Sequence, residues 1–182
     1  AAQEMISVVV DNTTGGYQAA EHLYGCGMRH PAMICGPEDR LSVQDRLKGF
    51  SQRAKELNLQ MPSDSYYGNY DFDHGFEAAK LLMKDHPETD GIFCANDYIA
   101  AGAISALQSM NIHIPNQVRV VGFDNRDFSE FWNTPITTFE LPLQEMGMLG
   151  VSLLKQVIHT GIYSKSQHVL QSKLIPRQSS KG

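Results

Sequence analysis

Three polar side chains stand where apolar runs of this sequence end, and their chemistry suits recognition of a small polar molecule. Asn96 ends the run GIFCAN, Asp124 follows VVGF, and Arg46 lies beyond AMICGP. Such runs predict buried parallel strands, and an open α/β sheet binds ligands at the carboxyl ends of its strands. We therefore predict that a carboxamide, a carboxylate and a guanidinium from distant parts of the chain meet at one edge of a sheet.

Asn96 and Asp124 also have purely structural interpretations. Asp97 or Asn96 is suited to cap the helix that the next residues predict, and Asp97 is the favoured cap. Asn96 nevertheless offers both a donor and an acceptor to a ligand. Asp124 is suited to a turn, because aspartate accepts hydrogen bonds from nearby backbone amides. The sequence leaves these alternatives open.

Arg46 falls in the first turns of a helix that is predicted to begin near Ser42. A cation is better placed near the end of a helix than near its start, so this position indicates an anionic or polar partner. The structural alternative is a surface ion pair with Asp39 or Asp45. Neither G-x-S-x-G nor H-E-x-x-H occurs, and nothing places a nucleophile beside a base, so we expect no catalytic residues.

Aromatic residues cluster around the same predicted edge. An aromatic ring stacked on a sugar or a base is a common wall of a binding pocket, and Tyr70 is the preferred candidate because it ends a predicted strand. For Phe123 and Phe131 a place in the core is at least as well supported. The full set is Tyr70, Phe72, Phe123, Phe128, Phe131 and Trp132.

Strand and helix patterns alternate along the chain, as in βαβ units. The sequence therefore predicts an α/β fold with a doubly wound, mostly parallel sheet and helices on both faces. Gly15 and Gly16 are predicted to form a hinge or tight turn after the first strand, and 126–135 a loop. The predicted strands are 6–12, 31–35, 65–70, 91–96, 119–125, 137–140 and 168–175, and the predicted helices are 17–25, 43–58, 72–85, 97–110 and 146–161.

Composition narrows the class of protein. The 182 residues carry a net charge of −5 with scattered lysine and arginine, which argues against a broad nucleic-acid surface. No apolar run approaches the roughly 20 residues of a membrane helix, and the first residues lack a signal-peptide pattern. Cys26, Cys35 and Cys94 are expected to be buried, reduced thiols, and no spacing suggests a metal site. We expect a cytoplasmic protein without cofactor or membrane contact.

Six segments, taken in order, resemble the effector-binding core of lactose-repressor-type (LacI/GalR) transcription regulators. They are VDNTTGGYQAAEHL, CGPEDRLSVQDRLKGF, NYDFDHGFEAAKLLM, GIFCANDYIAAGAISAL, IPNQVRVVGFDN and TPITTFELPLQEMG. Each is weak alone, but their order and spacing are specific, and the resemblance extends over nearly the whole chain. It implies a periplasmic-binding-protein-like lobe that senses a sugar, a sugar phosphate or a purine. It also implies control of operator binding, and a homodimer.

The resemblance assigns effector contacts position by position. Arg46 matches the arginine of R-x-x-G-F, Asn96 the asparagine of N-D-x-x-A-x-G, and Asp124 the aspartate of G-[FY]-D. The sequence departs from the family at Met28, where a histidine is usual, which affects the start of a strand and not the pocket. The other implied positions are Tyr70 for stacking, Arg40 and Ser42 for contacts seen in some members, and Asp11 at the hinge between two lobes.

The same resemblance divides the chain into three parts. Residues 1–141 correspond to the C-terminal effector-binding lobe, 142–162 to a helix that crosses into the other lobe, and 163–182 to a returning strand and tail. The helix-turn-helix that would bind operator DNA, and the opening units of the first lobe, have no counterpart in this sequence. The apolar face of the crossing helix is therefore expected to be exposed, repacked or used for association.

Two other classes of protein compete with a regulator's sensor domain. A transport-type periplasmic sugar-binding protein has the same architecture, but the missing signal pattern and the unpaired cysteines argue against it. An enzyme on this fold requires a catalytic pair at the strand ends, whereas the sequence supplies one acid, one amide and one arginine there. We therefore predict an effector-sensing domain that is not an enzyme.

Overall fold

The centre of the protein is a small parallel sheet. The computed structural model describes residues 6–161 and 166–181. The strands β2 (Pro31–Ile34), β3 (Gly91–Cys94) and β4 (Arg119–Val121) pair in the order β2-β3-β4. Nearly every residue of these strands is buried, because helices cover both faces, and this is why they appear as continuous apolar runs in the sequence.

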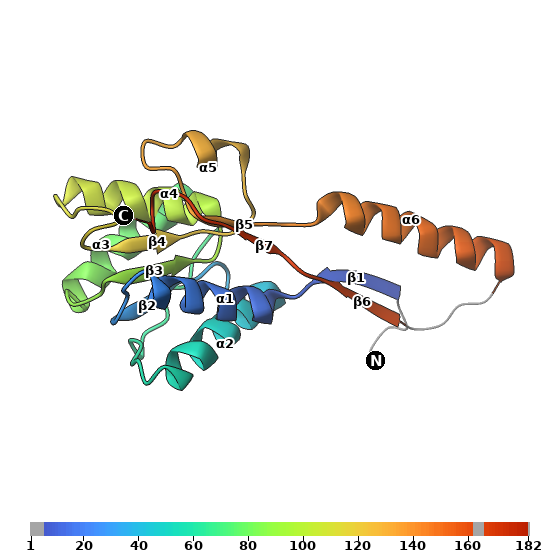
Figure 1. Ribbon diagram of the computed structural model, residues 1–182, viewed down its shortest axis with the longest axis horizontal. Helices are drawn as coiled ribbons and strands as arrows, with labels where there is room; N and C mark the ends of the chain where they lie inside the picture. Colours follow the sequence, from blue (N-terminus) through green and yellow to red (C-terminus); the bar gives the residue numbers. More distant parts are fainter. Residues whose placement is uncertain (1–5, 162–165, 182) are drawn as a thin grey trace.

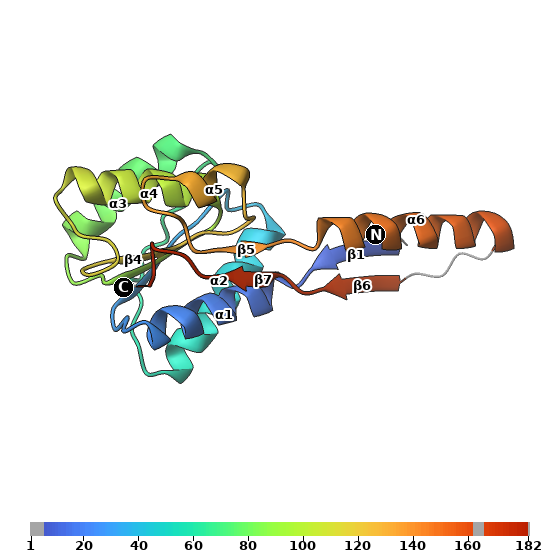
Figure 2. The same ribbon diagram turned by 45° about the horizontal axis from the view of Figure 1, so that its top comes forward.

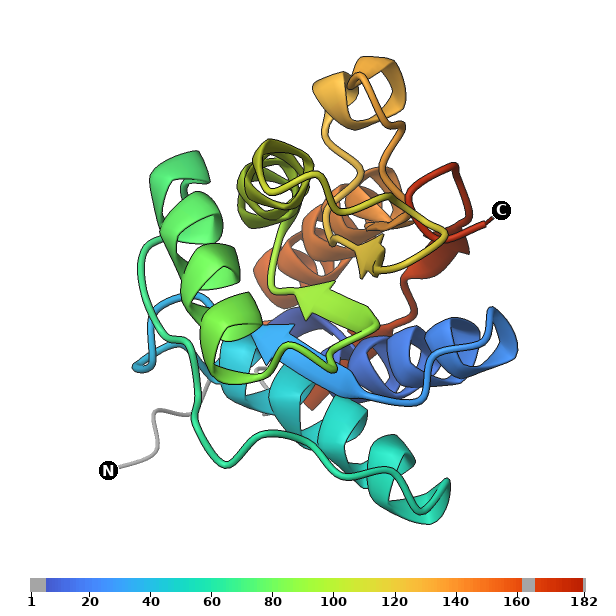
Figure 3. The same cartoon turned by 90° about the vertical axis from the view of Figure 1, so that its left-hand side faces the viewer.

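Two pairs of helices cover this sheet (Figure 3). On one face lie α1 (Asn12–Gly25) and α2 (Leu41–Glu56), and on the other lie α3 (Phe72–Asp85) and α4 (Asp97–Ser109). Parallel strands thus alternate with helices, which confirms the predicted α/β class. The core is built from aliphatic and aromatic side chains of the sheet and of the inner helix faces, among them Phe50, Phe93 and Phe123.

A second group of elements extends away from this lobe (Figure 1). β5 and β7 leave the lobe side by side as an antiparallel pair, and β1 and β6 form a parallel pair beyond them. Figure 2 shows α6 lying alongside β1 in this extension. The bounds are β1 (Ile6–Val10), β5 (Thr138–Glu140), α6 (Leu143–Thr160), β6 (Ser166–Leu170) and β7 (Lys173–Ile175).

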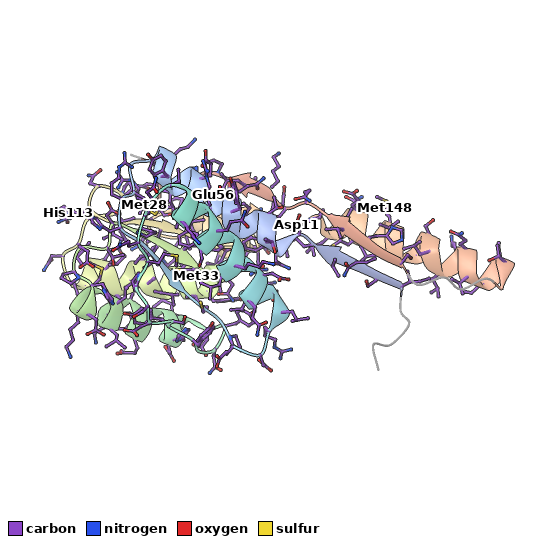
Figure 4. The ribbon with its side chains drawn as sticks, turned by 90° about the horizontal axis from the view of Figure 1, so that it is seen from below. Asp11, Met28, Met33, Glu56, His113 and Met148 are labelled. Atoms are coloured by element: carbon purple, nitrogen blue, oxygen red, sulfur yellow. The ribbon has the colours of Figure 1, made fainter. Side chains whose placement is uncertain are left out.

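The helix α6 exposes a row of large apolar side chains, as expected from the sequence. It has no buried residue, and Met148 lies in the extension beyond Asp11 (Figure 4). It ends at Gly161, whose φ of 65° is the left-handed conformation typical after a helix. Among the described residues, no helix is long and apolar enough to cross a membrane. The exposed row comprises Leu143, Met148, Val151, Leu154 and Ile158.

The predicted strand at 65–70 is wrong. Only Tyr66 pairs with the sheet, through an isolated parallel bridge to Ile34 in β2. Beyond it the imidazole of His74 occupies the space where a side chain at Gly68 would stand, only 2.2 Å from an added Cβ. The chain then bends toward Asp71, whose carboxylate accepts from the backbone N–H of His74 and caps α3. The segment therefore leaves the sheet edge after a single residue.

Two further expectations need correction. The predicted strand 168–175 is split into β6 and β7, because β6 pairs with β1 outside the lobe whereas β7 pairs with β5 at the lobe. The buried Ser172 lies in the break between them. The predicted loop 126–135 contains a short helix, α5 (Asp127–Phe131), which the density of aromatic residues obscured.

Gly15 and Gly16 are inside α1 and do not form the predicted hinge. The helix begins at Asn12, five residues before the predicted start, because the carboxylate of Asp11 accepts the backbone N–H of Thr14 and caps it. A Cβ at Gly16 would lie 2.0 Å from the carbonyl oxygen of Arg46 in α2. The glycine therefore permits the close contact that sets the backbone of Arg46.

We expect Gly49→Ala to destabilise the lobe strongly. Gly49 is the partner glycine on α2, and a Cβ there would lie 1.9 Å from the carbonyl oxygen of Thr13. Because the obstacle is backbone, α1 and α2 must separate, at a cost of about 3 kcal/mol. Urea unfolding measures the loss. The control is Gly147→Ala in α6, where no atom lies within 4 Å of the added Cβ. Alanine there should be neutral or stabilising by about 0.5–1 kcal/mol, and equal effects of the two substitutions would contradict this account.

Candidate effector site

Arg46 is a buried cation at the centre of the candidate site. Its side chain, only 8% exposed, leaves the second turn of α2. Its Nε donates to Asn12 Oδ1 at 2.9 Å and its Nη1 to the carbonyl of Ala95. The guanidinium lies over the ring of Phe123, 3.6 Å from the centroid, a cation–π contact that strengthens away from water. Arg46 is therefore held in one orientation.

Asp124 faces this cation across a gap. Arg46 Nη2 and Asp124 Oδ1 are 3.7 Å apart, which is an ion pair but too long for a direct hydrogen bond. Burial lowers the pKa of Arg46, and the Asp124 charge opposes that shift. Burial likewise raises the pKa of Asp124, against the effect of Arg46. A ligand hydroxyl placed between them can accept from the guanidinium and donate to the carboxylate.

Asn96 is both the cap of α4 and a member of this edge. Its Oδ1 accepts from the backbone N–H of Ile99 at 2.8 Å, so the favoured prediction of Asp97 as the cap is wrong. Its Nδ2 donates to the carbonyl of Tyr70 at 3.5 Å. Asn96 directly follows Ala95, whose carbonyl binds Arg46. The amide is therefore oriented by two fixed contacts beside the guanidinium.

Asp97 points the opposite way, into the protein. It is fully buried, and its Oδ1 accepts from Thr138 Oγ1 at 2.5 Å while its Oδ2 accepts from the backbone N–H of Arg126 at 2.7 Å. Burial raises its pKa to about 7, and the two hydrogen bonds oppose that shift only in part. Asp97 therefore joins α4 to β5 and to the turn after Asp124.

The structure places two of the three remaining predicted contacts at this edge and the third away from it. The ring of Tyr70 lies against Gly36, where a Cβ would come within 2.4 Å of it, and its hydroxyl is 3.4 Å from Ser42 Oγ. These two residues therefore adjoin Asn96 at the same edge. The exposed Arg40 instead pairs with Asp39, at 3.8 Å. The surface ion pair considered for Arg46 is thus found at Arg40.

Asp11 lies where β1 meets the lobe (Figure 4). Besides capping α1, its Oδ2 accepts from Thr14 Oγ1 at 2.7 Å and from Gln171 Nε2 at 3.1 Å. These hydrogen bonds hold the pKa of Asp11 below its usual value, against the opposing and larger single effect of burial. Asp11 therefore ties β1 to the chain between β6 and β7, while its role as a hinge stays a prediction.

Several residues of the site were missed in the sequence. Asn12 could have been found, because it ends the first apolar run just as Asn96 ends another. Thr138, which binds Asp97, carried no such signal, since its contact depends on where β5 meets the lobe. The described residues contain no cluster of three side chains able to hold a metal ion. Of the free cysteines, Cys35 and Cys94 are buried as predicted, but Cys26 is only partly buried.

The fold and this edge define a class of protein: an α/β lobe with a parallel sheet, in which a guanidinium, a carboxylate and a carboxamide lie together beyond the strand ends. The sequence profile of the "Periplasmic binding protein-like domain" family matches residues 20–180, and the chain belongs to that family. Within it, the chain is an effector-binding domain of the LacI regulator type.

Individual relatives agree with this assignment. The chain is 31% identical over 171 residues to the HTH-type transcriptional repressor PurR of Haemophilus influenzae, covering 92% of this chain and 51% of that one. The structure of a transcriptional regulator CelR–cellobiose complex has 30% identity and a TM-score of 0.88, covering 97% of this chain and 54% of that one. An operator-bound Lac repressor dimer, at 23% identity, TM-score 0.88 and coverage of 97% and 53%, shares the fold. These relatives are regulators and not enzymes, and the chain spans about half the length of the curated relatives it matches.

Proposed function

We propose that this chain senses a small polar effector through Arg46, Asp124, Asn96 and Tyr70, with Ser42 beside them. The observation that carries the proposal is the buried Arg46–Asp124 pair, held 3.7 Å apart by contacts with other residues. A buried ion pair costs desolvation, so a pair left open at a strand-end edge is better explained by recognition than by stability. Arg40, which pairs with Asp39, has the weakest support as a contact.

A sugar suits this edge best. Adjacent hydroxyls can bridge the guanidinium and the carboxylate, the amide of Asn96 offers a donor, and the ring of Tyr70 offers a stacking face. The CelR complex contains cellobiose, which supports the same class of ligand. A sugar phosphate would use the cation, and a purine would use the stacking face, so both belong in the test.

The effector is proposed to control DNA binding in a longer protein. Residues 1–141 would form the effector-binding lobe, 142–162 the crossing helix, and 163–182 the returning strand and tail. Positions 1–5, 162–165 and 182 of that division lie outside the described residues. The apolar row on α6 supports the division, because a second lobe would cover it. Effector binding would then favour one lobe arrangement and so change operator affinity, acting inside the cell.

The longer protein is proposed to be a homodimer. Phe131 of α5 is 83% exposed and Tyr98 of α4 is 45% exposed, and a second copy of the protein would cover them. The Lac repressor of the same fold is a dimer. A periplasmic-type sugar-binding protein is the alternative function. The first residues of the full-length gene product separate the two, because a helix-turn-helix supports the regulator and a cleaved apolar leader supports the transport protein.

We expect the full-length protein to bind effector and this chain to bind it weakly or not at all, because the first, N-terminal lobe would supply the rest of the pocket. Titration calorimetry with D-ribose, cellobiose, lactose, sugar phosphates and purines measures both. A dissociation constant for the chain at least tenfold weaker than for the full-length protein supports the proposal. Equally tight binding by the chain alone would contradict a pocket shared between two lobes.

A further inference from the structure

The turn that carries Asp124 has an unfavourable backbone conformation. Asp124 has a φ of 102° and Asn125 a φ of 48°, and neither is glycine. Residues held in such regions cost on the order of 1–3 kcal/mol each and persist only where their surroundings enforce them. The carboxylate that faces Arg46 is therefore aimed by whatever holds this turn.

The backbone amides of the turn are all taken by two elements. Asp124 N–H donates to the carbonyl of Phe139 at 3.0 Å, and Asn125 N–H donates to Thr138 Oγ1 at 3.2 Å, both in β5. Arg126 N–H donates to the buried Asp97 carboxylate at 2.7 Å. Thr138 also donates to Asp97 at 2.5 Å, so β5 and the start of α4 hold the turn together.

Arg177 holds the turn from its other side. Its Nη2 donates to Asn125 Oδ1 at 2.8 Å. Its Nη1 donates to Ser129 Oγ at 3.1 Å and to the carbonyl of Ile136 at 2.9 Å. One guanidinium thus joins the turn, the helix α5 and the chain leading into β5. Arg177 belongs to the tail that follows β7, the strand paired with β5 (Figure 1).

We infer that Arg177 is a positioning residue for effector recognition: through Asn125 it fixes the turn that aims the Asp124 carboxylate at Arg46. The inference rests on the proposed function for the role of Asp124 and adds a residue from outside the effector edge. A consequence is that the site is tied directly to β5 and β7, the two segments that leave the lobe. Displacement of either segment alters the aim of Asp124.

Amide hydrogen exchange tests the inference without any effector. In Arg177→Met the amides of Asp124, Asn125 and Arg126 should exchange about tenfold faster or more, since a hydrogen bond from a charged donor is lost. Amides of β3 should be unchanged. Arg177→Lys keeps the charge but not the planar fork and should fall between. Gln178→Met, at the exposed neighbouring position, is the matched control. Unchanged exchange at the turn in Arg177→Met would overturn the inference.

A second arm keeps the inference separate from the proposed function. Asn125→Gly removes the side-chain carboxamide that Arg177 binds, and glycine tolerates the positive φ. This variant therefore tests the same contact if Arg177→Met fails to fold. If Arg177 acts through Asn125, combining Arg177→Met with Asn125→Gly should weaken the affinity for D-ribose or cellobiose no more than the more damaging single substitution does. The affinity is measured in the full-length protein. Additive losses would count against the inference. If Arg46→Met leaves sugar binding intact, the proposed site is wrong, whereas the exchange result still decides the role of Arg177.

Discussion

We expect Arg46→Ala in the full-length protein to abolish the response to effector and to leave operator binding intact. The substitution removes the buried cation whose Nη2 lies 3.7 Å from Asp124 Oδ1 and leaves that carboxylate, 19% exposed, without its counter-charge. Hydrogen bonds to charged groups are worth about 1.5–3 kcal/mol each, and a ligand hydroxyl or phosphate would make at least two. We therefore expect a loss of about 100-fold or more in effector affinity. Calorimetry on the full-length protein measures the affinity, and an operator-shift titration measures DNA binding.

Two companion variants make this result specific. Arg46→Lys keeps a positive charge but cannot make the separate contacts with Asn12 and Ala95 from one planar group, so it should recover little affinity. Arg53→Ala removes an arginine of the same helix that pairs with Glu21 and Glu56, and it should leave affinity within about threefold, since surface ion pairs contribute little. Normal induction of Arg46→Ala would remove Arg46 from the site.

Much of this edge could be predicted from the sequence because ligands of α/β proteins bind at the carboxyl ends of the strands. Arg46, Asn96 and Asp124 lie far apart in the chain, yet each follows a buried strand, and parallel strands end at one edge. The structure places the three together, while effector contact itself stays a prediction. Local pattern was sufficient for Asn96 and Asp124, which follow closely after β3 and β4, whereas Arg46 lies in the second turn of α2 and is brought to the edge by that helix.

The errors arise where a side chain's direction or a distant contact decides the outcome. The place of Asp97 at a helix start predicts a cap, but its neighbour Asn96 caps α4 and Asp97 turns inward to Thr138. Gly16 predicts a hinge, whereas in the structure its missing side chain allows α1 and α2 to pack closely at Arg46. Residue type and order alone do not encode these choices, because both depend on elements more than 25 residues away in the chain.

The supporting contacts of the site were the least accessible to sequence analysis. Arg177 lies in the tail, and its partner Asn125 lies in a turn, 52 positions away in the chain. Neither stands in a motif that local periodicity can read. The strained backbone of Asp124 is likewise invisible in a sequence that has no glycine there. Long-range hydrogen bonds, rather than local propensity, determine this part of the molecule.

The second large effect is a loss of stability as pH rises, caused by Asp97. Burial raises its pKa to about 7, whereas an aspartate in an unfolded chain titrates near about 3.9. Between these values the folded protein binds a proton that the unfolded chain has released, so stability falls with rising pH and the loss is complete above about pH 7. From pH 5 to pH 8 we expect a decrease of about 2–3 kcal/mol from this group.

The hydrogen-bond partners of Asp97 can accommodate a protonated, neutral carboxyl group. When protonated it can donate to Thr138 Oγ1, because a hydroxyl accepts as well as donates, while its other oxygen keeps the bond from the Arg126 amide. The nearby charge of Asp124 favours the neutral form, and that of Arg177 opposes it. Arg46 and the Cys94 thiol also lie within its electrostatic influence. Asp97 and Asp124 therefore repel each other less at pH 5, where Asp97 is protonated, than at pH 8.

Comparison with Asp97→Asn isolates this effect from other titrations. The pKa of the partly buried His22 is lowered mainly by burial, and it makes stability rise with pH in part of the same range. Because both proteins contain His22, its titration cancels in the difference between their unfolding free energies, which then reports Asp97 and its effect on neighbouring charges. Asparagine can reproduce the contacts of the neutral carboxyl at every pH, because its Nδ2 can donate to Thr138 Oγ1 while its Oδ1 accepts from the Arg126 amide. Urea unfolding at pH 5, 6, 7 and 8 should show the variant gaining about 2–3 kcal/mol relative to the native chain, and a difference that does not change with pH would show that Asp97 is ionised throughout.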